Sequence, residues 1–469
     1  MIRFCSGVCV AGSLLLQGCG PKATARKEAL ANPFSDLSLE RYLQEVQPLV
    51  EASVGRKFDA PPIVEIAQQG PFNEMMMAEQ ILIYEKVMPD TPEAIRNQMV
   101  EASNESISRG LLGKYGLLDK KTYLCAEGLI LSLKYSQTDP AETEAWTKLI
   151  LAHEITHAME DQELDMLAML DTIRDEDALQ AASGTWEGLA TLAEEDVARE
   201  LGLMDQYDQL IGLQGWSRDG LEEVRAYRTW ATYGQGRDFV AYHRDNGGIE
   251  KMWKVMHNPP PTTGMLFRPE SWAAEIAPPE MDYASVLRGT EQLLSKGEWI
   301  IANSKLGEFA LRGEAIRSGD EEEFDRILAH LKDAHALTLE RPDRKGAIRL
   351  LVFEDDTWPE QYLDLLRSEE TASAAEIAAA MDVTVEVTYQ PLPDLEEQVG
   401  ADAATLRTQR VPIGGGRHRE TRGAWVARGD TLVVVEAAQF RPGLRLGRTV
   451  EGVFSNLDAA RAQVGAPAP

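Results

Sequence analysis

Residues 149–162 read Leu-Ile-Leu-Ala-His-Glu-Ile-Thr-His-Ala-Met-Glu-Asp-Gln, and this stretch determines how the rest of the chain is interpreted. No glycine or proline occurs between Ala145 and Leu170, so the segment predicts one helix. Side chains four residues apart share a face of a helix, which brings the imidazoles of His153 and His157 close together. That spacing suits two ligands of a tetrahedral zinc ion. Glu154 can reach a zinc-bound water, so we expect it to be the catalytic base.

A catalytic zinc ion needs a third protein ligand and an open fourth position. Glu187 follows downstream on a helical stretch, beside the small residues Gly188 and Ala190. These small residues would let the second helix approach the metal helix closely. We therefore predict Glu187 as the third ligand. Other acids remain open as rivals for this role: Glu194, Glu195, Asp171 and Asp175.

Further side chains near the predicted centre have two interpretations each. Asp161 lies four residues beyond His157, where it either orients a ligand imidazole or is a surface acid near the helix end. Tyr233, or one of the histidines outside the motif, could stabilise the oxyanion of the transition state. The remaining histidines show no ligand spacing: His243, His257, His330, His335 and His418.

The first residues predict an export signal rather than part of the fold. Residues 4–16 are apolar or small, a run too short for an ordinary membrane-spanning helix but suited to a signal peptide. The run ends in Leu16-Gln17-Gly18-Cys19, which resembles the bacterial lipoprotein signal. We expect a signal peptide over residues 1–18, acylation of Cys19 and a tether over residues 19–36. The alternative is a simple secretory signal with an incidental cysteine.

These features predict an exported protein that a lipid anchor holds in the cell envelope. A glycine rather than an aspartate follows the cysteine, which favours the outer membrane facing the periplasm. The formal charge of −29 makes nucleic acid an improbable partner, because phosphate binding needs a basic face. After processing, only Cys19 and Cys125 remain, so a disulfide framework is not expected. Nothing in the sequence indicates an oligomeric state.

The pattern of apolar residues indicates an α+β protein with two domains after the tether. Residues 37–340 are mainly helical, with candidate strands at 62–67 and 122–125. Residues 341–462 form a smaller α/β domain of unknown role. Its predicted elements are strands at 347–353 and 383–389, a hairpin over 425–437, and helices at 359–367 and 373–381.

A basic cluster stands out on this acidic chain. Arginines and a histidine surround the triplet Gly414-Gly415-Gly416. The cluster is either a solvated loop or a binding site for an anionic partner, such as lipid phosphate or an acidic protein. Its members are Arg407, Arg410, Arg417, His418, Arg419 and Arg422.

Together these motifs resemble the gluzincin class of zinc metallopeptidases, and in particular a group of mostly uncharacterised bacterial secreted proteins. The resemblance spans roughly residues 111–308. It implies a zincin-like catalytic domain, zinc held by His153, His157 and Glu187, and catalysis by Glu154. The matching segments are 119–123, 151–162, 187–191, 233–236 with Phe239, 247–248, Pro260 with Thr262-Thr263, and 306–308.

Three positions depart from the family pattern. Gly264-Met265 stand where the family has an acidic and an amide residue, and Arg268 replaces the histidine of a His-Pro-Glu segment. Thr191 stands where many gluzincins have an aspartate that orients a ligand histidine. The expected function is zinc-dependent hydrolysis of peptide bonds in the bacterial envelope, with a peptide or protein as substrate. The alternatives are a catalytically inactive lipoprotein that binds or scaffolds, and an amidase acting on cell-wall peptides.

Overall fold

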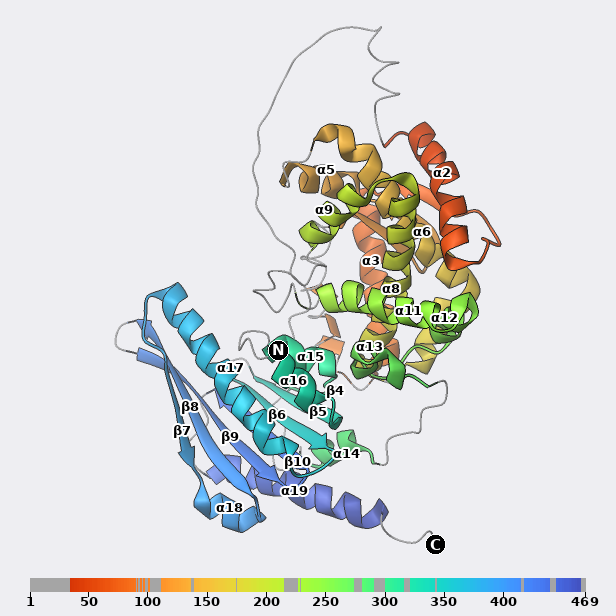
Figure 1. The fold of residues 1–469 in the computed structure, drawn as a ribbon. Helices are drawn as coiled ribbons and strands as arrows, with labels where there is room; N and C mark the ends of the chain where they lie inside the picture. Colours follow the sequence, from red (N-terminus) through yellow and green to blue (C-terminus); the bar gives the residue numbers. More distant parts are fainter. Residues whose placement is uncertain are drawn as a thin grey trace.

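A computed structural model of the chain shows an N-terminal, mainly helical part and a C-terminal part built on a large sheet (Figure 1). This mixture of helices and strands agrees with the predicted α+β class. The predicted domain boundaries stay a prediction. Among the described residues, no helix combines the length and apolar composition needed to cross a membrane. The structure describes residues 34–464 apart from 90, 92, 95, 98–99, 102–110, 136–138, 174, 215–226, 228, 274–280, 291–299, 316–320, 342–343, 415–416 and 439–443.

In the N-terminal part, two long helices, α6 and α8, pack against each other and are surrounded by the others. Most side chains of α6 are buried on every face, as expected for a central helix. The α-helices are α2 (Asp36–Val54), α3 (Gln69–Val87), α5 (Ala126–Tyr135), α6 (Thr143–Leu164), α7 (Met166–Met169), α8 (Glu176–Leu201), α9 (Met204–Gln214), α11 (Gly236–Asp245), α12 (Gly248–His257) and α13 (Gly264–Phe267). Short 3-10 turns and one π-helix complete this part: η1 (Pro140–Glu142), η2 (Leu170–Thr172), η3 (Ala231–Gln235, the π-helix) and η4 (Pro269–Ser271).

The helix predicted to continue to Leu170 ends earlier. Asp165 has a φ of 50°, a left-handed conformation that aspartate tolerates better than most residues. Its carboxylate then accepts a hydrogen bond from the backbone N–H of Ala168, which starts α7. The chain thus turns soon after the segment that carries His153 and His157, a change that composition alone does not reveal.

A small three-stranded sheet packs against α6. It consists of β1 (Ile63–Ile66), β2 (Gly113–Gly116) and β3 (Lys121–Leu124), with β3 in the centre. β1 pairs with β3 in parallel and β2 pairs with it antiparallel, so both strands predicted in this region are confirmed. The sheet leaves β2 at one edge, directly over the helix that carries the histidines.

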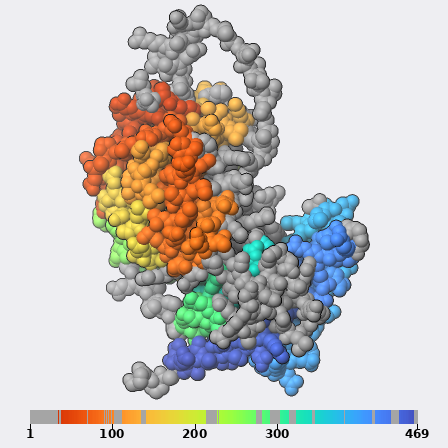
Figure 2. Space-filling model, turned by 180° about the vertical axis from the view of Figure 1, so that it is seen from behind, coloured from red at the N-terminus to blue at the C-terminus, as the bar shows by residue number. Residues whose placement is uncertain are grey.

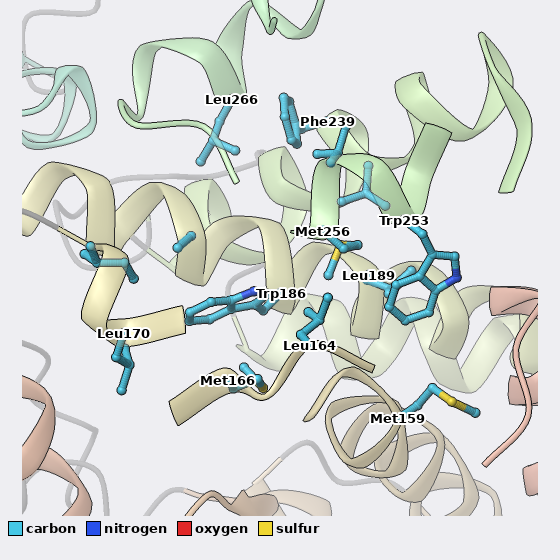
Figure 3. Close-up of a cluster of buried hydrophobic side chains, with 14 of the residues drawn as sticks. Met159, Leu164, Met166, Leu170, Trp186, Leu189, Phe239, Trp253, Met256 and Leu266 are labelled. Atoms are coloured by element: carbon cyan, nitrogen blue, oxygen red, sulfur yellow. The ribbon is translucent and has the colours of Figure 1, made fainter. Parts of the chain in front are cut away.

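The largest apolar cluster of the N-terminal part surrounds α8 and includes residues of the elements before it, such as Met159 and Leu164, and of the helices that follow it (Figure 3). Trp186 and Leu189 of α8 contribute to it from one side, and Phe239, Trp253 and Met256 from the other. Burying one such side chain contributes about 1.5–3 kcal/mol. This cluster therefore fixes α8 firmly against α11 and α12.

Glycines allow α8 to approach the start of α11 at backbone distance. A Cβ atom on Gly188 would lie 2.3 Å from the carbonyl oxygen of Gly236, and one on Gly236 would lie 2.0 Å from that of Gly184. The sequence predicts that Gly188 lies at the contact with the helix of His153 and His157. This prediction is wrong, because Gly188 faces Gly236 instead.

The C-terminal part contains a seven-stranded sheet in which all neighbouring strands are antiparallel. The order across the sheet is β4-β5-β6-β10-β9-β8-β7. The strands predicted at 347–353 and 383–389 and the hairpin at 425–437 are confirmed, but β4 and β5 lie in a region that the sequence analysis interpreted as helical. The bounds are β4 (Ile300–Lys305), β5 (Leu331–Arg341), β6 (Arg344–Phe353), β7 (Glu386–Pro391), β8 (Ala403–Gly414), β9 (Arg417–Arg428) and β10 (Thr431–Ala438).

Helices cover both faces of this sheet. Along β10, Leu432 and Val434 point into one apolar cluster while Val433 and Val435 point into the other. The early and late residues of the chain occupy separate regions of the surface seen from behind (Figure 2). The first helical layer holds α15 (Glu308–Ala315), α16 (Glu321–Leu328) and α17 (Trp358–Met381), and the second holds α14 (Tyr283–Arg288), α18 (Pro393–Val399) and α19 (Leu444–Val464).

α17 is one continuous helix where the sequence predicted two. The polar stretch between the predicted helices is held by tertiary contacts. Glu370 accepts hydrogen bonds from Arg407 and from the hydroxyl of Tyr389, both at 2.9 Å, and Glu369 is buried. The contacts of Glu370 satisfy its carboxylate without breaking the helix.

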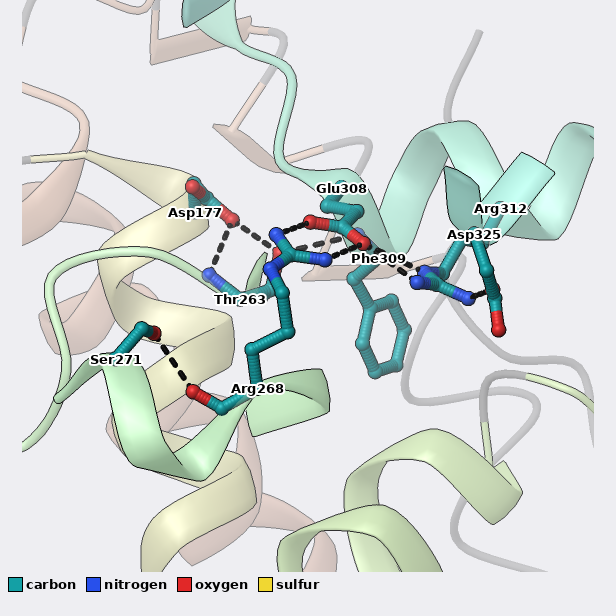
Figure 4. Close-up of polar contacts among 8 residues, drawn as sticks. All are labelled: Asp177, Thr263, Arg268, Ser271, Glu308, Phe309, Arg312 and Asp325. Atoms are coloured by element: carbon teal, nitrogen blue, oxygen red, sulfur yellow. Dashed lines mark hydrogen bonds and ion pairs between the residues drawn. The ribbon is translucent and has the colours of Figure 1, made fainter. Parts of the chain in front are cut away.

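A buried polar network joins the start of α8 to the start of α15 (Figure 4). Thr263 donates its backbone N–H and its hydroxyl to Asp177, and its hydroxyl oxygen accepts a hydrogen bond from the N–H of Phe309. Arg268 and Arg312 both donate to the buried carboxylate of Glu308. Arg268, which departs from the family pattern, therefore has a structural role here. The segment 306–308 connects the large sheet to the helical part through Glu308.

The glycine contact gives a prediction for stability. We expect Gly188→Ala to destabilise the fold by about 1–3 kcal/mol, because the added methyl group meets backbone atoms that cannot move aside. Gly212→Ala on α9 is the matched control, since nothing lies within 4 Å of its position. Alanine there should be neutral or stabilising by up to about 1 kcal/mol. The midpoint of thermal unfolding measures both, and equal midpoints would contradict the packing argument.

Candidate metal centre

His153 and His157 lie in the middle of α6, where the helix is covered on all sides. Both imidazoles are shielded from solvent, and their ring centroids are 5.0 Å apart with nearly perpendicular planes. The regular helix explains the arrangement, because the four-residue spacing stacks both side chains on one face. That face is the one that α8 contacts.

Glu187 of α8 meets both imidazoles. One of its carboxylate oxygens lies 3.0 Å from Nε2 of His153 and 3.3 Å from Nε2 of His157. One ligand atom from each of the three residues lies within 4.8 Å of the others. The three residues therefore form a group that can hold a metal ion, with the composition that the sequence predicted.

The outer nitrogen of each imidazole contacts a second, buried carboxylate. Nδ1 of His153 lies 3.2 Å from Glu194, and Nδ1 of His157 lies 2.7 Å from Glu160. Glu194 is only 1% exposed and Glu160 is fully buried. Carboxylates in this position fix the tautomer and orientation of metal-binding histidines, leaving Nε2 to face the ion.

The sequence predicts neither of these two roles. It offers Glu194 only as a rival ligand, and nothing in the predicted site involves Glu160. The spacing along each helix could have indicated these roles. Glu160 is three residues after His157, and Glu194 is two helical turns beyond Glu187 on α8, so each acid lies on the same helix face as a predicted ligand. Acids on the ligand face of a buried helix are candidates for contact with a ligand imidazole.

The carboxylates around the two imidazoles shift the pKa values of the group. Burial alone would lower the pKa of His153, but its hydrogen bonds with Glu187 and Glu194 outweigh burial and raise the pKa to about 9. Burial would raise the pKa of Glu187, yet His157 and His153 hold that pKa well below its usual range. Burial raises the pKa of Glu160 to about 7, against the opposing charge of His157.

Glu154 lies beside the histidines and beneath the edge strand of the small sheet. Burial raises the pKa of Glu154, partly opposed by the nearby positive charges. A Cβ atom on Gly113 of β2 would lie 2.7 Å from Cγ of Glu154, so only glycine allows this strand to pass so close. The next residue, Lys114, forms an ion pair of 3.0 Å with buried Glu79 and so fixes a positive charge near the group.

Tyr233 also belongs to this site. It lies in the π-helix η3, and its ring centroid is 5.9 Å from that of His153. Single π-helical turns inside helices occur frequently at functional sites. The close contact between Gly188 and Gly236 holds this turn against α8, which explains why a glycine-containing segment follows Tyr233.

Asp161 does not orient a ligand imidazole. Its carboxylate accepts a hydrogen bond from the hydroxyl of Tyr115 at 2.7 Å and pairs with Lys120 at 2.7 Å. It also accepts a hydrogen bond from the N–H of Met166. Asp161 is neither a ligand orienter nor a surface acid, because it joins the end of α6 to the small sheet.

The other rival ligands lie away from the group. Glu195 pairs with Arg199 and Arg237. Asp171 pairs with Lys86, and Asp175 caps the start of α8. None of the other histidines joins the metal-binding group found among the described residues: His243, His257, His330, His335 and His418.

Cys125 follows β3 directly and is half-buried. Burial raises the pKa of its thiol to about 12, so little reactive thiolate forms at neutral pH. A structural role fits it best.

No protein-family model matches the chain, and no match is found among curated proteins. Among solved structures, the chain is similar to one from Chloroflexus aurantiacus described as "a putative hydrolase with a novel fold". The two are 19% identical, with a TM-score of 0.37, and the match covers 53% of this chain and 88% of the other. A TM-score this low does not establish a shared fold or activity.

The carboxylate behind His153 gives a prediction for metal affinity. We expect Glu194→Gln to weaken the binding of a metal ion at this group roughly ten- to hundredfold, because the amide no longer fixes the imidazole as a carboxylate does. Glu195→Gln is the matched control, since the neighbouring carboxylate faces Arg199 and Arg237 instead. Competition with a chromophoric chelator measures both affinities. Equal affinities of the two variants would show that Glu194 does not support the ligand.

Proposed function

We propose that this protein is a gluzincin-type zinc metallopeptidase that hydrolyses peptide bonds in the bacterial cell envelope. One observation carries the proposal. The Nε2 atoms of His153 and His157 converge on Glu187, while a buried carboxylate backs each Nδ1 atom. Two imidazoles that only needed to pack in a core would not require this paired arrangement of carboxylates.

The donor set fits zinc. Two imidazole nitrogens and one carboxylate oxygen are a recurrent ligand set of catalytic zinc sites, which keep a fourth position open. When bound, zinc would polarise a carbonyl and make water more acidic. His153, His157 and Glu187 would hold it, with Glu194 and Glu160 orienting the two histidines.

The chain's own residues supply the proton transfers. Glu154 is the general base that takes a proton from the attacking water and then returns it to the leaving amine. Its burial raises its pKa, so the carboxyl group can both gain and release that proton. Tyr233, whose ring lies beside His153, would donate a hydrogen bond to the developing oxyanion.

The edge strand offers a way to bind an extended peptide. β2 lies at the end of the small sheet and passes directly over Glu154 at Gly113. An extended substrate can add to such an edge through backbone hydrogen bonds. This mode of binding would place a peptide bond beside the base and favours a peptide over a compact small molecule.

We further propose that Cys19 carries a lipid anchor and that the protein faces the periplasm from the outer membrane. The signal peptide, Cys19 and most of the predicted tether lie outside the described residues. The proposal rests on the sequence pattern alone. It places the metal centre near peptides and proteins of the envelope.

The anchor is tested by fractionation of cells that express the full chain. We expect Cys19→Ser to move the protein from the detergent-soluble membrane fraction to the aqueous fraction, because acyl chains contribute about 0.8 kcal/mol for each buried methylene. A Cys125→Ser variant serves as the cysteine control. Unchanged membrane association of Cys19→Ser would rule out acylation of this residue.

The catalytic proposal is tested by metal content and hydrolysis together. We expect about one zinc ion per chain by elemental mass spectrometry, as the three-ligand group implies. Removal of the zinc should abolish cleavage of a synthetic peptide library. Glu154→Gln should retain the zinc but lower the cleavage rate roughly 10²–10⁴-fold. Glu163→Gln, on the same helix and paired with Arg56, is the control.

Three outcomes would redirect the proposal. Absence of zinc after purification with zinc supplied would reject the metallopeptidase. Bound zinc with a cellular role that survives Glu154→Gln in full would favour the inactive binding or scaffold protein. Cleavage confined to peptides within purified peptidoglycan would identify an amidase that uses the same centre.

A further inference from the structure

The hairpin formed by β8 and β9 extends beyond the rest of the large sheet (Figure 1). β7 starts at Glu386, opposite Arg410 of β8, and β10 ends at Ala438, opposite Thr421 of β9. Among the described strands, the hairpin residues beyond these points pair only with each other. We call residues 410–414 and 417–420 of this hairpin the basic ribbon.

The helical layers do not cover the basic ribbon. In β9, residues 423–427 are buried between the layers, whereas Arg417, His418 and Arg419 at its start are all exposed. Consecutive side chains of a strand point to opposite faces, so both faces of the ribbon are open. The sheet does not need this extension for its own core.

The charges of the ribbon are left partly unbalanced. Its acid, Glu420, pairs with Arg410 at 2.8 Å and with Arg422 at 2.5 Å. Within the part of the chain that the structure describes, Arg417 and Arg419 have no acidic partner. A chain with a formal charge of −29 therefore presents two free guanidinium groups at one end of its sheet.

Apolar side chains accompany these arginines. Ile413 lies between Pro412 and Gly414, where the register of the hairpin shifts, and it is 53% exposed. Met381, the last residue of α17, is also 53% exposed. It precedes Glu386 by five residues, and Glu386 is the first residue of β7 and pairs with Arg410. Two exposed apolar side chains therefore belong to the same end of the sheet as the arginines.

We propose that the basic ribbon docks the protein onto a bilayer that contains anionic lipids, with Arg417 and Arg419 on lipid phosphates and Ile413 in the boundary between headgroups and acyl chains. Guanidinium groups bind phosphate oxygens in a bidentate manner. Basic residues beside exposed apolar side chains are the composition of interfacial contacts. An acidic protein could pair with the arginines, but it would not explain why the apolar side chain of Ile413 is exposed beside them. This contact is independent of the metal centre and of the anchor at Cys19.

The experiment uses the full chain with Cys19→Ser in every sample, so that acylation cannot contribute. Cosedimentation measures partitioning onto vesicles of phosphatidylcholine alone or mixed equally with phosphatidylglycerol. We expect binding to the anionic vesicles and weaker binding as salt is added. Arg417→Ser with Arg419→Ser should lower the partition coefficient roughly fivefold for each arginine removed. Ile413→Ser should also lower it.

The matched control removes two positive charges elsewhere. Lys254→Ser with Arg448→Ser changes the net charge equally, at exposed positions on α12 and α19. It should leave vesicle binding unchanged, and all variants should keep the thermal midpoint of the parent. An equal loss of binding in control and ribbon variants would overturn the proposal, as would equal binding of the parent to both vesicles. A ribbon variant that loses binding to poly-glutamate but not to vesicles would overturn it in favour of a protein partner.

Discussion

The arrangement of the helical part follows from the burial of charge where α6 and α8 meet. Glu154, Glu160 and Glu194 are buried there with two imidazoles, and Glu187 lies between the rings. An isolated ionised carboxylate in a protein interior is unfavourable by several kcal/mol, so each one needs a partner of opposite charge. The imidazoles meet part of this need, and a divalent cation between them would meet more. The surrounding helices, the small sheet and the glycine contacts position these groups so that opposite charges face each other.

The ligand group could be predicted because it depends on local geometry. A helix places residues four apart on one face, and that rule alone brings His153 and His157 together. The contacts of Asp161 and Glu194 could not be predicted in this way. They depend on what each helix face meets in space, and Asp161 meets Tyr115 of β2 and Lys120 of the turn that follows it. Spacing along one helix identifies candidates, whereas the neighbouring element decides between them.

The same distinction holds for the fold. The hairpin of β9 and β10 was predictable, because apolar runs at 424–427 and 432–435 lie on either side of a Gly-Asp turn. β5 was missed because helices cover both faces of the sheet, and its residues 333–337 are all buried without alternation. α17 was divided in the prediction because its central polar residues resemble a helix end. Their partners, Arg407 and Tyr389, lie on strands that follow in the chain.

The unequal lengths of β7 and β8 also affect how copies of this protein interact when they are crowded. An open strand edge can recruit a strand from another molecule and start aggregation. The end of β8 that passes β7 exposes such an edge, but it contains Pro412, which has no backbone N–H to donate. The neighbouring arginines repel a second copy of the same hairpin. The edge therefore resists self-association while its side chains remain available to other partners.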